Sequence, residues 1–227
     1  MGWPGTVVFD LDGTLVDSGP DLTAALNVAL DRAGRPAVDP ATVRHLVGHG
    51  ARALIERGLA LSGGGTAADV AQALPVFLDY YAEHLADATR PYPGVETALD
   101  ALAADGARLA ICTNKPAGLA HGLVAALGWS GRFAAVLGGD SLAVRKPDPA
   151  HLLATIAAAG GSVADSAFVG DTAVDVAAAR GARVPVVIWA LGFADVPAAD
   201  LDADAVFDRF AVLPAVLAAI APGSARG

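Results

Sequence analysis

Acidic side chains follow apolar segments at two places in the sequence. Asp10 and Asp12 come directly after residues 6–9, and Asp171 comes after residues 167–169. Because the carboxyl ends of the strands meet at one edge of an open α/β sheet, we expect these carboxylates to converge. Converging carboxylates repel each other and any phosphate dianion, so the site needs a hard divalent cation. Mg²⁺ is the expected cofactor, since it prefers oxygen ligands and leaves room for water and a phosphate oxygen.

Lysine is rare in this chain. Lys115 and Lys146 are the only lysines among the 15 basic residues, and the others are arginines. A sequence that uses arginine elsewhere is expected to keep lysine where a compact ammonium is needed. Lys146 is therefore predicted to bridge a carboxylate and a phosphate oxygen. Lys115 can be explained in the same way or as the cap of its own loop.

These residue types together indicate phosphoryl transfer. Asp10, kept ionised by Mg²⁺ and Lys146, is predicted to attack phosphorus and form an aspartyl phosphate. Asp12 is predicted to protonate the leaving alkoxide and afterwards to deprotonate the attacking water. Thr113 and Asn114 follow another apolar run and precede a helical pattern, a position that favours phosphate binding. An ordinary Asx-type turn explains Thr113 and Asn114 about as well.

Short apolar runs recur along the chain and alternate with alanine-rich helical patterns. Strands are predicted at residues 6–9, 108–112, 134–137, 167–169 and 184–189. Helices are predicted between and after them at residues 95–105, 118–127, 149–159 and 175–180. Near-continuous apolar runs are typical of strands that are covered on both faces. The pattern therefore predicts an α/β fold with a doubly wound parallel sheet.

A long segment with helical periodicity interrupts this alternation after the first strand. Helices are predicted within it at residues 20–33, 40–46, 51–61 and 67–88. A single crossover helix does not need so many residues. We therefore predict an inserted α-helical cap at residues 17–90, and a catalytic core made of residues 1–16 and 91–227.

The composition bounds the partners and the location of the protein. A net charge of −9 and a pI near 4.8 argue against a nucleic-acid surface, which needs clustered basic residues. Charges, glycines or prolines interrupt every apolar stretch before bilayer length, and no leader segment is recognised. We therefore expect a cytoplasmic protein without a membrane partner. The expected ligand is a small phosphorylated metabolite, and the chain is expected to be a monomer or a homodimer.

In type and order, these residues resemble the four motifs of the haloacid dehalogenase superfamily of phosphotransferases. The matching residues, in order, are Asp10-Leu11-Asp12-Gly13-Thr14, then Thr113-Asn114, then Lys146, then Asp171 with Asp175. The resemblance covers nearly the whole chain and implies a Rossmann-like core with a helical cap inserted after the first motif. It also implies that Mg²⁺ is held by Asp10, the backbone carbonyl of Asp12, and Asp171. Asp175 is then expected to hold these ligands in position without binding Mg²⁺ itself.

Within that superfamily the sequence is most similar to the bacterial phosphoglycolate phosphatases. The similarity lies in residues 47–51, 54–57, 113–116 and 138–140. It implies that the substrate is 2-phosphoglycolate, which is hydrolysed to glycolate and phosphate. The substrate contacts that it implies are Gly13, His49, Gly50, Arg57, Thr113, Asn114 and Lys146. Of these, Arg57 is expected to pair with a carboxylate of the substrate.

Three other functions stay open at this stage. The chain could hydrolyse a sugar phosphate, or it could be a phosphomutase that returns the phosphoryl group from the aspartate to a sugar. It could also be a non-catalytic phosphate-binding or regulatory protein that shares the fold. The presence of Asp10, Asp12, Lys146 and Asp171 argues against this last function.

Overall fold

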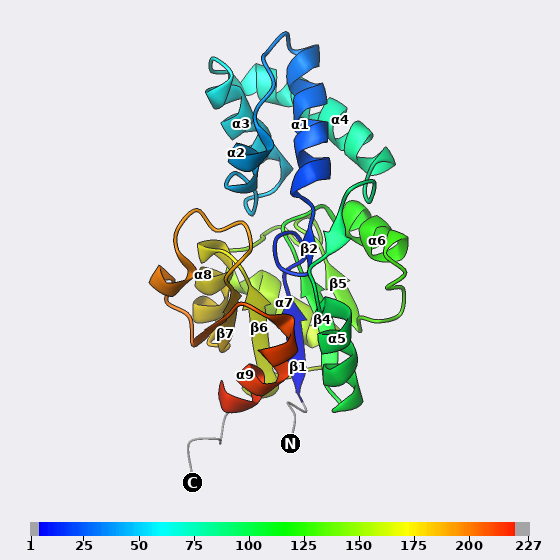
Figure 1. Ribbon diagram of the computed structural model, residues 1–227, viewed down its shortest axis with the longest axis vertical. Helices are drawn as coiled ribbons and strands as arrows, with labels where there is room; N and C mark the ends of the chain where they lie inside the picture. The colour runs from blue at the N-terminus through cyan, green and yellow to red at the C-terminus, as the bar shows by residue number, and fades with distance from the viewer. Residues whose placement is uncertain (1–4, 221–227) are drawn as a thin grey trace.

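A six-stranded parallel sheet forms the centre of the molecule (Figure 1). The computed structural model describes residues 5–220, so the predicted core limits at residues 1 and 227 lie outside the described residues. The strands are β1 (Thr6–Phe9), β4 (Arg108–Cys112), β5 (Ala135–Leu137), β6 (Ser166–Gly170), β7 (Val186–Trp189) and β8 (Ala205–Phe207). Their order is β5-β4-β1-β6-β7-β8, and every neighbouring pair is parallel. The predicted α/β class is confirmed.

Strand β1 explains why the apolar runs have no polar face. Val7 and Phe9 pack into the apolar cluster on one face of the sheet, whereas Val8 packs into the cluster on the other face. All three are fully buried. Alternating side chains of one strand therefore enter two separate cores, and both sets have to be apolar.

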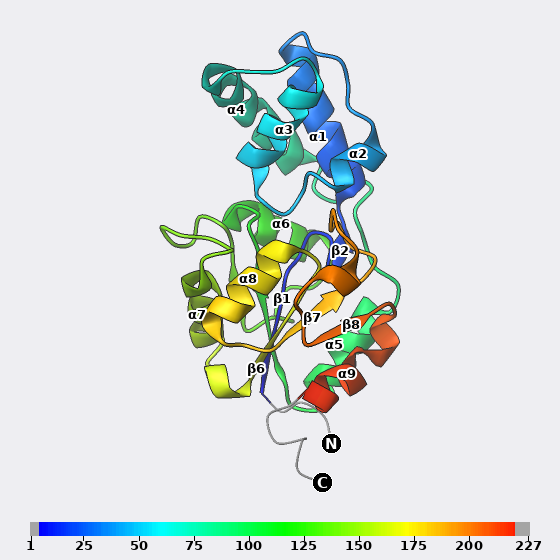
Figure 2. The ribbon, with the colours of Figure 1, turned by 90° about the vertical axis from the view of Figure 1, so that its left-hand side faces the viewer.

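Helices cover both faces of the sheet (Figure 2). The helices of the core are α5 (Val95–Ala104), α6 (Ala117–Ala126), α7 (Pro149–Ala158), α8 (Ala173–Ala182) and α9 (Leu213–Ile220). Leu152 of α7 and Val176 of α8 share the cluster of Val8. Leu99 of α5 and Leu213 of α9 share the cluster of Phe9 on the opposite face. Three short 3₁₀ helices lie at Val163–Asp165, Ala198–Asp200 and Phe210–Val212.

The sequence patterns did not predict two elements near the end of the described chain, β8 and α9. Strand β8 has three residues at the edge of the sheet, and its Val206 is 43% exposed. So short a strand, open on one face, carries neither a long apolar run nor a clear alternation. Helix α9 has only eight residues, with a proline in its first turn.

Four helices form a separate layer beyond the upper end of the sheet (Figure 1). They are α1 (Gly19–Arg32), α2 (Pro40–Arg44), α3 (Ala51–Leu61) and α4 (Ala67–Glu83). Their buried side chains, such as Leu26, Ile55 and Phe77, form a third apolar cluster with its own members. Helix α4 continues through Pro75 and ends five residues before the predicted limit at residue 88. Among the described residues, none of the helices has the length and apolar character that a bilayer span requires.

The two chain segments that connect this layer to the sheet lie side by side. Strand β2 (Val16–Asp17) pairs in antiparallel fashion with β3 (Arg90–Pro91). The buried Asp21 carboxylate at the start of α1 accepts hydrogen bonds from the backbone N–H groups of Ala88 and Thr89 and from the Thr89 hydroxyl, at 2.7–3.1 Å. The first helix is thereby tied to the second connecting segment.

Candidate active site

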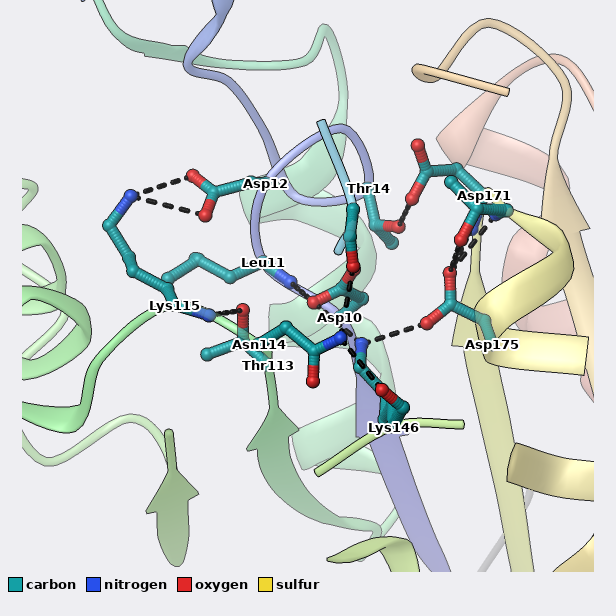
Figure 3. A network of polar contacts seen from close by, with 12 residues as sticks. Asp10, Leu11, Asp12, Thr14, Thr113, Asn114, Lys115, Lys146, Asp171 and Asp175 are labelled. Atoms are coloured by element: carbon teal, nitrogen blue, oxygen red, sulfur yellow. Dashed lines mark hydrogen bonds and ion pairs between the residues drawn. The ribbon is translucent and has the colours of Figure 1, made fainter. Parts of the chain in front are cut away.

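Polar side chains from three neighbouring strands meet at the end of the sheet that faces the helical layer. Asp10, Thr113 and Asp171 follow β1, β4 and β6, respectively. The ladder continues one residue past each of two strands, since Asp10 N–H donates to the Val169 carbonyl at 2.9 Å and Thr113 N–H to the Leu137 carbonyl at 3.0 Å. The sheet therefore fixes the backbone from which the first two of these side chains project (Figure 3).

Lys146 lies buried beneath this edge and is 2% exposed. Its Nζ lies 2.9 Å from Asp10 Oδ1 and 2.8 Å from Asp175 Oδ1. Burial by itself lowers the pKa of Lys146, but Asp10 and Asp175 outweigh it and raise the pKa above its ordinary value. The ammonium therefore stays charged and binds both carboxylates, as expected for a compact cation.

His151 is a second buried titratable group beside this lysine, on α7, and we predict that it makes stability depend on pH. Burial and the Lys146 charge lower the pKa of His151 from 6.5 to about 4. Between these values the unfolded chain binds a proton that the folded chain does not. The contribution of His151 to stability is therefore complete above pH 6.5 and is lost as the pH falls toward 4.

The test compares urea unfolding of the wild type and His151→Gln at pH 7.5 and pH 4.5. We expect the free energy of unfolding of the wild type, relative to the variant, to fall on the order of 1–2 kcal/mol on acidification, after allowance for solvent screening. Taking the difference between the two proteins cancels the other titrating groups. A difference that does not change with pH contradicts the prediction.

Asp10 itself is held through one of its two oxygens. Oδ1 accepts from the Leu11 N–H at 2.7 Å and from Lys146. Both of these contacts fall on Oδ1, so Oδ2 is the oxygen that is available to a ligand. Burial raises the pKa of Asp10 to about 6, even though Lys146 acts in the opposite direction.

Three buried carboxylates form the part of the site that fits a metal ion. One oxygen from each of Asp10, Asp171 and Asp175 lies within 4.8 Å of the others. Burial, followed by the charges of Asp175 and Asp10, raises the pKa of Asp171 well above its ordinary value. Lys146 supplies one positive charge against three carboxylates, so the cluster lacks compensating charge. An oxygen-rich, negatively charged cluster of this kind fits a hard divalent cation such as Mg²⁺.

The chain holds Asp171 and Asp175 in different ways. Asp171 accepts from the Thr14 hydroxyl at 2.8 Å and from the Phe193 N–H at 2.7 Å. Asp175 uses Oδ1 for Lys146, and its Oδ2 accepts from the N–H groups of Asp171 and Thr172 and from the Thr172 hydroxyl at 2.8–3.2 Å. Protein donors thus contact both oxygens of each carboxylate, but Asp175 alone of the two accepts from Lys146 and from the Asp171 backbone, which suits a residue that orients its neighbours.

Gly13 is the position where the backbone itself limits the choice of residue. Its φ of +87° lies in the left-handed region, and a Cβ atom there would lie 2.3 Å from Asp171 Oδ2 and 2.7 Å from the Phe193 ring. Any larger residue would therefore push Asp171 away from the cluster.

The carboxylate of Asp12 lies apart from this cluster and faces a different cation (Figure 3). Lys115 Nζ donates to Asp12 Oδ1 at 2.9 Å and to Oδ2 at 3.1 Å, and it also donates to the Tyr81 hydroxyl of α4. The Lys115 side chain is 3% exposed. Burial lowers the pKa of Lys115, but Asp12 and Tyr81 outweigh it, and the pKa is raised above its ordinary value.

Sequence reasoning left Lys115 between a site role and a loop cap, and it assigned no site role to Tyr81. Lys115 does not cap its loop with its side chain, because the ammonium contacts Asp12 and Tyr81. The scarcity of lysine was the one signal that pointed to Lys115. Tyr81 carried no signal, since a tyrosine on an apolar helix face is ordinarily part of the core.

A small cavity lies between the helical layer and the sheet. Its volume is about 40 Å³, on the order of three water molecules. The residues that line it are Asp10, Asp12, Leu22, Val47, Gly48, Gly50, Ala51, Leu54, Tyr81, Thr113, Asn114, Lys115 and Pro116. The two aspartates predicted to carry out the chemistry therefore line the same cavity.

The remaining residues predicted to contact the substrate lie around this cavity in different ways. Thr113, Asn114 and Gly50 line it. Asn114 Nδ2 donates to the carbonyls of Gly48 and Lys146, both at 3.0 Å, and so connects the helical layer to the core. Arg57 donates to the Leu46 carbonyl at 3.1 Å, and His49 is exposed. Neither Arg57 nor His49 is among the lining residues.

The fold and the site define a Rossmann-like α/β enzyme with an acidic centre, partly neutralised by lysine, at the carboxyl ends of its strands. A family model described as haloacid dehalogenase-like hydrolase matches residues 4–183. The chain belongs to the haloacid dehalogenase-like hydrolase family.

Relatives and solved structures with similar sequences agree with this assignment. The chain is 44% identical to a phosphoglycolate phosphatase of Agrobacterium fabrum over 211 residues, covering 92% of this chain and 91% of the relative. It is 45% identical to a phosphoglycolate phosphatase of Rhodospirillum rubrum over 228 residues, covering 98% and 95%. A crystal structure from Haemophilus somnus, described as a predicted phosphoglycolate phosphatase, has 34% identity and a TM-score of 0.87, covering 93% of this chain and 97% of that one.

Proposed function

We propose that this enzyme hydrolyses a phosphate monoester through an aspartyl phosphate on Asp10. One observation carries the proposal. Asp10 is buried at the end of the central strand and bound to Lys146 through Oδ1 alone, and it faces a small cavity that Asp12 also lines. A carboxylate with one oxygen fixed and the other available is suited to nucleophilic attack.

The two half-reactions use Asp10 and Asp12 in separate roles. In the first, an Asp10 oxygen forms a bond to phosphorus, the bond from phosphorus to the ester oxygen breaks, and Asp12 gives that oxygen a proton. In the second, Asp12 takes a proton from water, whose oxygen attacks phosphorus and releases the Asp10 carboxylate. Lys146, the Thr113 hydroxyl and the backbone around Gly13 would bind the phosphate oxygens, so catalysis is mostly positioning and charge neutralisation.

Mg²⁺ is the cofactor that the carboxylate cluster fits. Asp10, the backbone carbonyl of Asp12, and Asp171 would hold it, while Asp175 keeps Lys146 and the Asp171 backbone in place. When bound, the ion would neutralise charge on the phosphate and on the buried carboxylates. Burial, with the neighbouring carboxylates adding to it, raises the pKa values of Asp10 and Asp171, so a bound cation is needed to keep both ionised, which supports this assignment.

The proposed substrate is 2-phosphoglycolate. The names of the relatives support it, since both relatives are phosphoglycolate phosphatases. Residues 17–90 would act as the cap that closes over this substrate, with β2 and β3 as its paired connection to the core. The separate apolar cluster of α1–α4 supports that division of the chain.

The experiment is phosphate release from 2-phosphoglycolate, p-nitrophenyl phosphate and hexose phosphates, with Mg²⁺ or with a chelator. We expect 2-phosphoglycolate to give the highest kcat/KM, and we expect chelation to lower it by at least about 100-fold, since several kcal/mol of charge stabilisation are removed. A preference for hexose phosphates would overturn the substrate and leave the mechanism standing. Full activity with the chelator would overturn the cofactor.

A further inference from the structure

We propose that Lys115 and the Tyr81 hydroxyl bind a carboxylate of the substrate that is attached one carbon from the ester oxygen. This inference rests on the proposed function, because it places the ester oxygen beside Asp12. It gives the phosphatase its preference for a phosphorylated 2-hydroxy acid over a phosphate ester of similar size that lacks the carboxylate. It also assigns a role to two residues that the chemistry at phosphorus does not use.

Two hydrogen-bond donors converge at this point of the cavity. The Lys115 ammonium donates to the Tyr81 hydroxyl oxygen and also lies 4.4 Å from the centre of the Tyr81 ring. A hydroxyl that accepts through its oxygen keeps its own proton for a further acceptor. Burial raises the pKa of Tyr81 to about 12, so that proton is retained at neutral pH. An ammonium and a hydroxyl side by side form a binding site for an anionic oxygen.

Among residues 5–220, no other positive side chain is available to that anion in the cavity. Lys146 is bound to Asp10 and Asp175 beneath the phosphate position. Lys115 is the only basic residue that lines the cavity in the part of the chain that the structure describes. The cap contributes apolar side chains such as Leu22, Val47 and Leu54. A buried ligand carboxylate without a cation would be strongly disfavoured, so it has to meet Lys115.

The position of Lys115 matches the shape of such a substrate. Asp12 must reach the ester oxygen in order to protonate it, and Lys115 Nζ lies 2.9 Å and 3.1 Å from the two Asp12 oxygens. A carboxylate joined to the ester oxygen through one carbon therefore falls within reach of the same ammonium. A carboxylate on a longer chain would instead extend toward the apolar wall of the cap.

Binding of the substrate would exchange one partner of Lys115 for another. In the structure, Asp12 occupies the ammonium through both of its oxygens. A substrate carboxylate that takes this place leaves the Asp12 oxygens free to face the ester oxygen. Because Tyr81 belongs to α4, the complete carboxylate site forms only with the cap in contact with the core.

The test measures kcat/KM for 2-phosphoglycolate and for ethyl phosphate, a monoester of similar length that lacks the carboxylate, in wild type, Lys115→Met and Tyr81→Phe. We expect the wild type to prefer 2-phosphoglycolate. Lys115→Met should lower the ratio of the two kcat/KM values by about 100-fold, and Tyr81→Phe by about fivefold, as expected for a charged and a neutral hydrogen bond. Tyr81→Phe keeps the ring that packs against Phe77, so it stays informative if Lys115→Met does not fold.

Two cap arginines provide matched comparisons. Arg52→Met removes an exposed cation whose partner, Glu56, lies 3.6 Å away. This variant should keep the wild-type ratio of the two kcat/KM values. Arg57→Met tests the residue that the sequence indicated for the carboxylate. The inference is overturned if Arg57→Met abolishes the preference in kcat/KM for 2-phosphoglycolate over ethyl phosphate. It is also overturned if Lys115→Met lowers kcat/KM equally for both esters. Absence of phosphate release by the wild type from all three esters, 2-phosphoglycolate included, is the separate result that removes the proposed function itself.

Discussion

Asp10→Asn is expected to lower kcat for phosphate release from 2-phosphoglycolate by at least about 10⁴-fold, the order of loss seen when a nucleophile is removed. Asparagine keeps the size of the side chain, and its oxygen can still accept from the Leu11 N–H. It is a poor nucleophile, however, and it cannot form an acyl phosphate by the same route. The measurement is steady-state release of inorganic phosphate with saturating Mg²⁺, together with acid-quench detection of phosphorylated protein.

The matched control for this change is Asp100→Asn, which alters an exposed aspartate on α5 that pairs with Arg132 at 2.9 Å. The control should retain full activity, because a surface ion pair contributes about 0–1 kcal/mol and lies on a helix outside the cavity. Asp10→Asn should form no phosphorylated protein, whereas the wild type should. Phosphate release that survives in Asp10→Asn at more than about a tenth of the wild-type rate excludes Asp10 as the nucleophile.

Lys146→Met is expected to lower the free energy of unfolding by about 3–5 kcal/mol, because removing one partner of a buried ion pair leaves an uncompensated charge. Lys146 is 2% exposed, and it faces Asp10 and Asp175, whose side chains are 7% and 1% exposed. Methionine fills most of the volume of the aliphatic chain but donates no hydrogen bond. The measurement is urea unfolding in the presence of a chelator, so that a bound cation does not replace the lost charge.

The control for size and composition is Arg52→Met, which breaks an exposed pair with Glu56. It should change the free energy of unfolding by less than about 1 kcal/mol. The double variant Asp10→Asn, Lys146→Met should be more stable than Lys146→Met alone, because the carboxylate left without a partner has been neutralised. If Lys146→Met is no less stable than Arg52→Met, the buried pair does not have the energetic role that its geometry indicates.

The sequence determined the main features of the fold, because local patterns record local burial. The runs at Thr6–Phe9 and Arg108–Cys112 are almost continuously apolar, because successive side chains enter the two cores on opposite faces of the sheet. This pattern predicted parallel strands that are covered on both faces. The rule that parallel strands present their carboxyl ends at one edge predicted that Asp10, Asp12 and Asp171 converge. Asp10 and Asp171 do, together with Asp175, whereas the prediction was wrong for the Asp12 carboxylate, which faces Lys115. The same rule does not reach β8, which is too short and too exposed to carry a pattern.

The tertiary structure alone decided how the charges are paired. The sequence placed Asp10 and Asp12 two residues apart, but it did not show that Asp10 faces Lys146 whereas Asp12 faces Lys115. It also did not show that Tyr81, 34 positions from Lys115, reaches this pair from α4. Such contacts depend on how the cap packs over the edge of the sheet, and side-chain periodicity within one element carries no information about a partner in another.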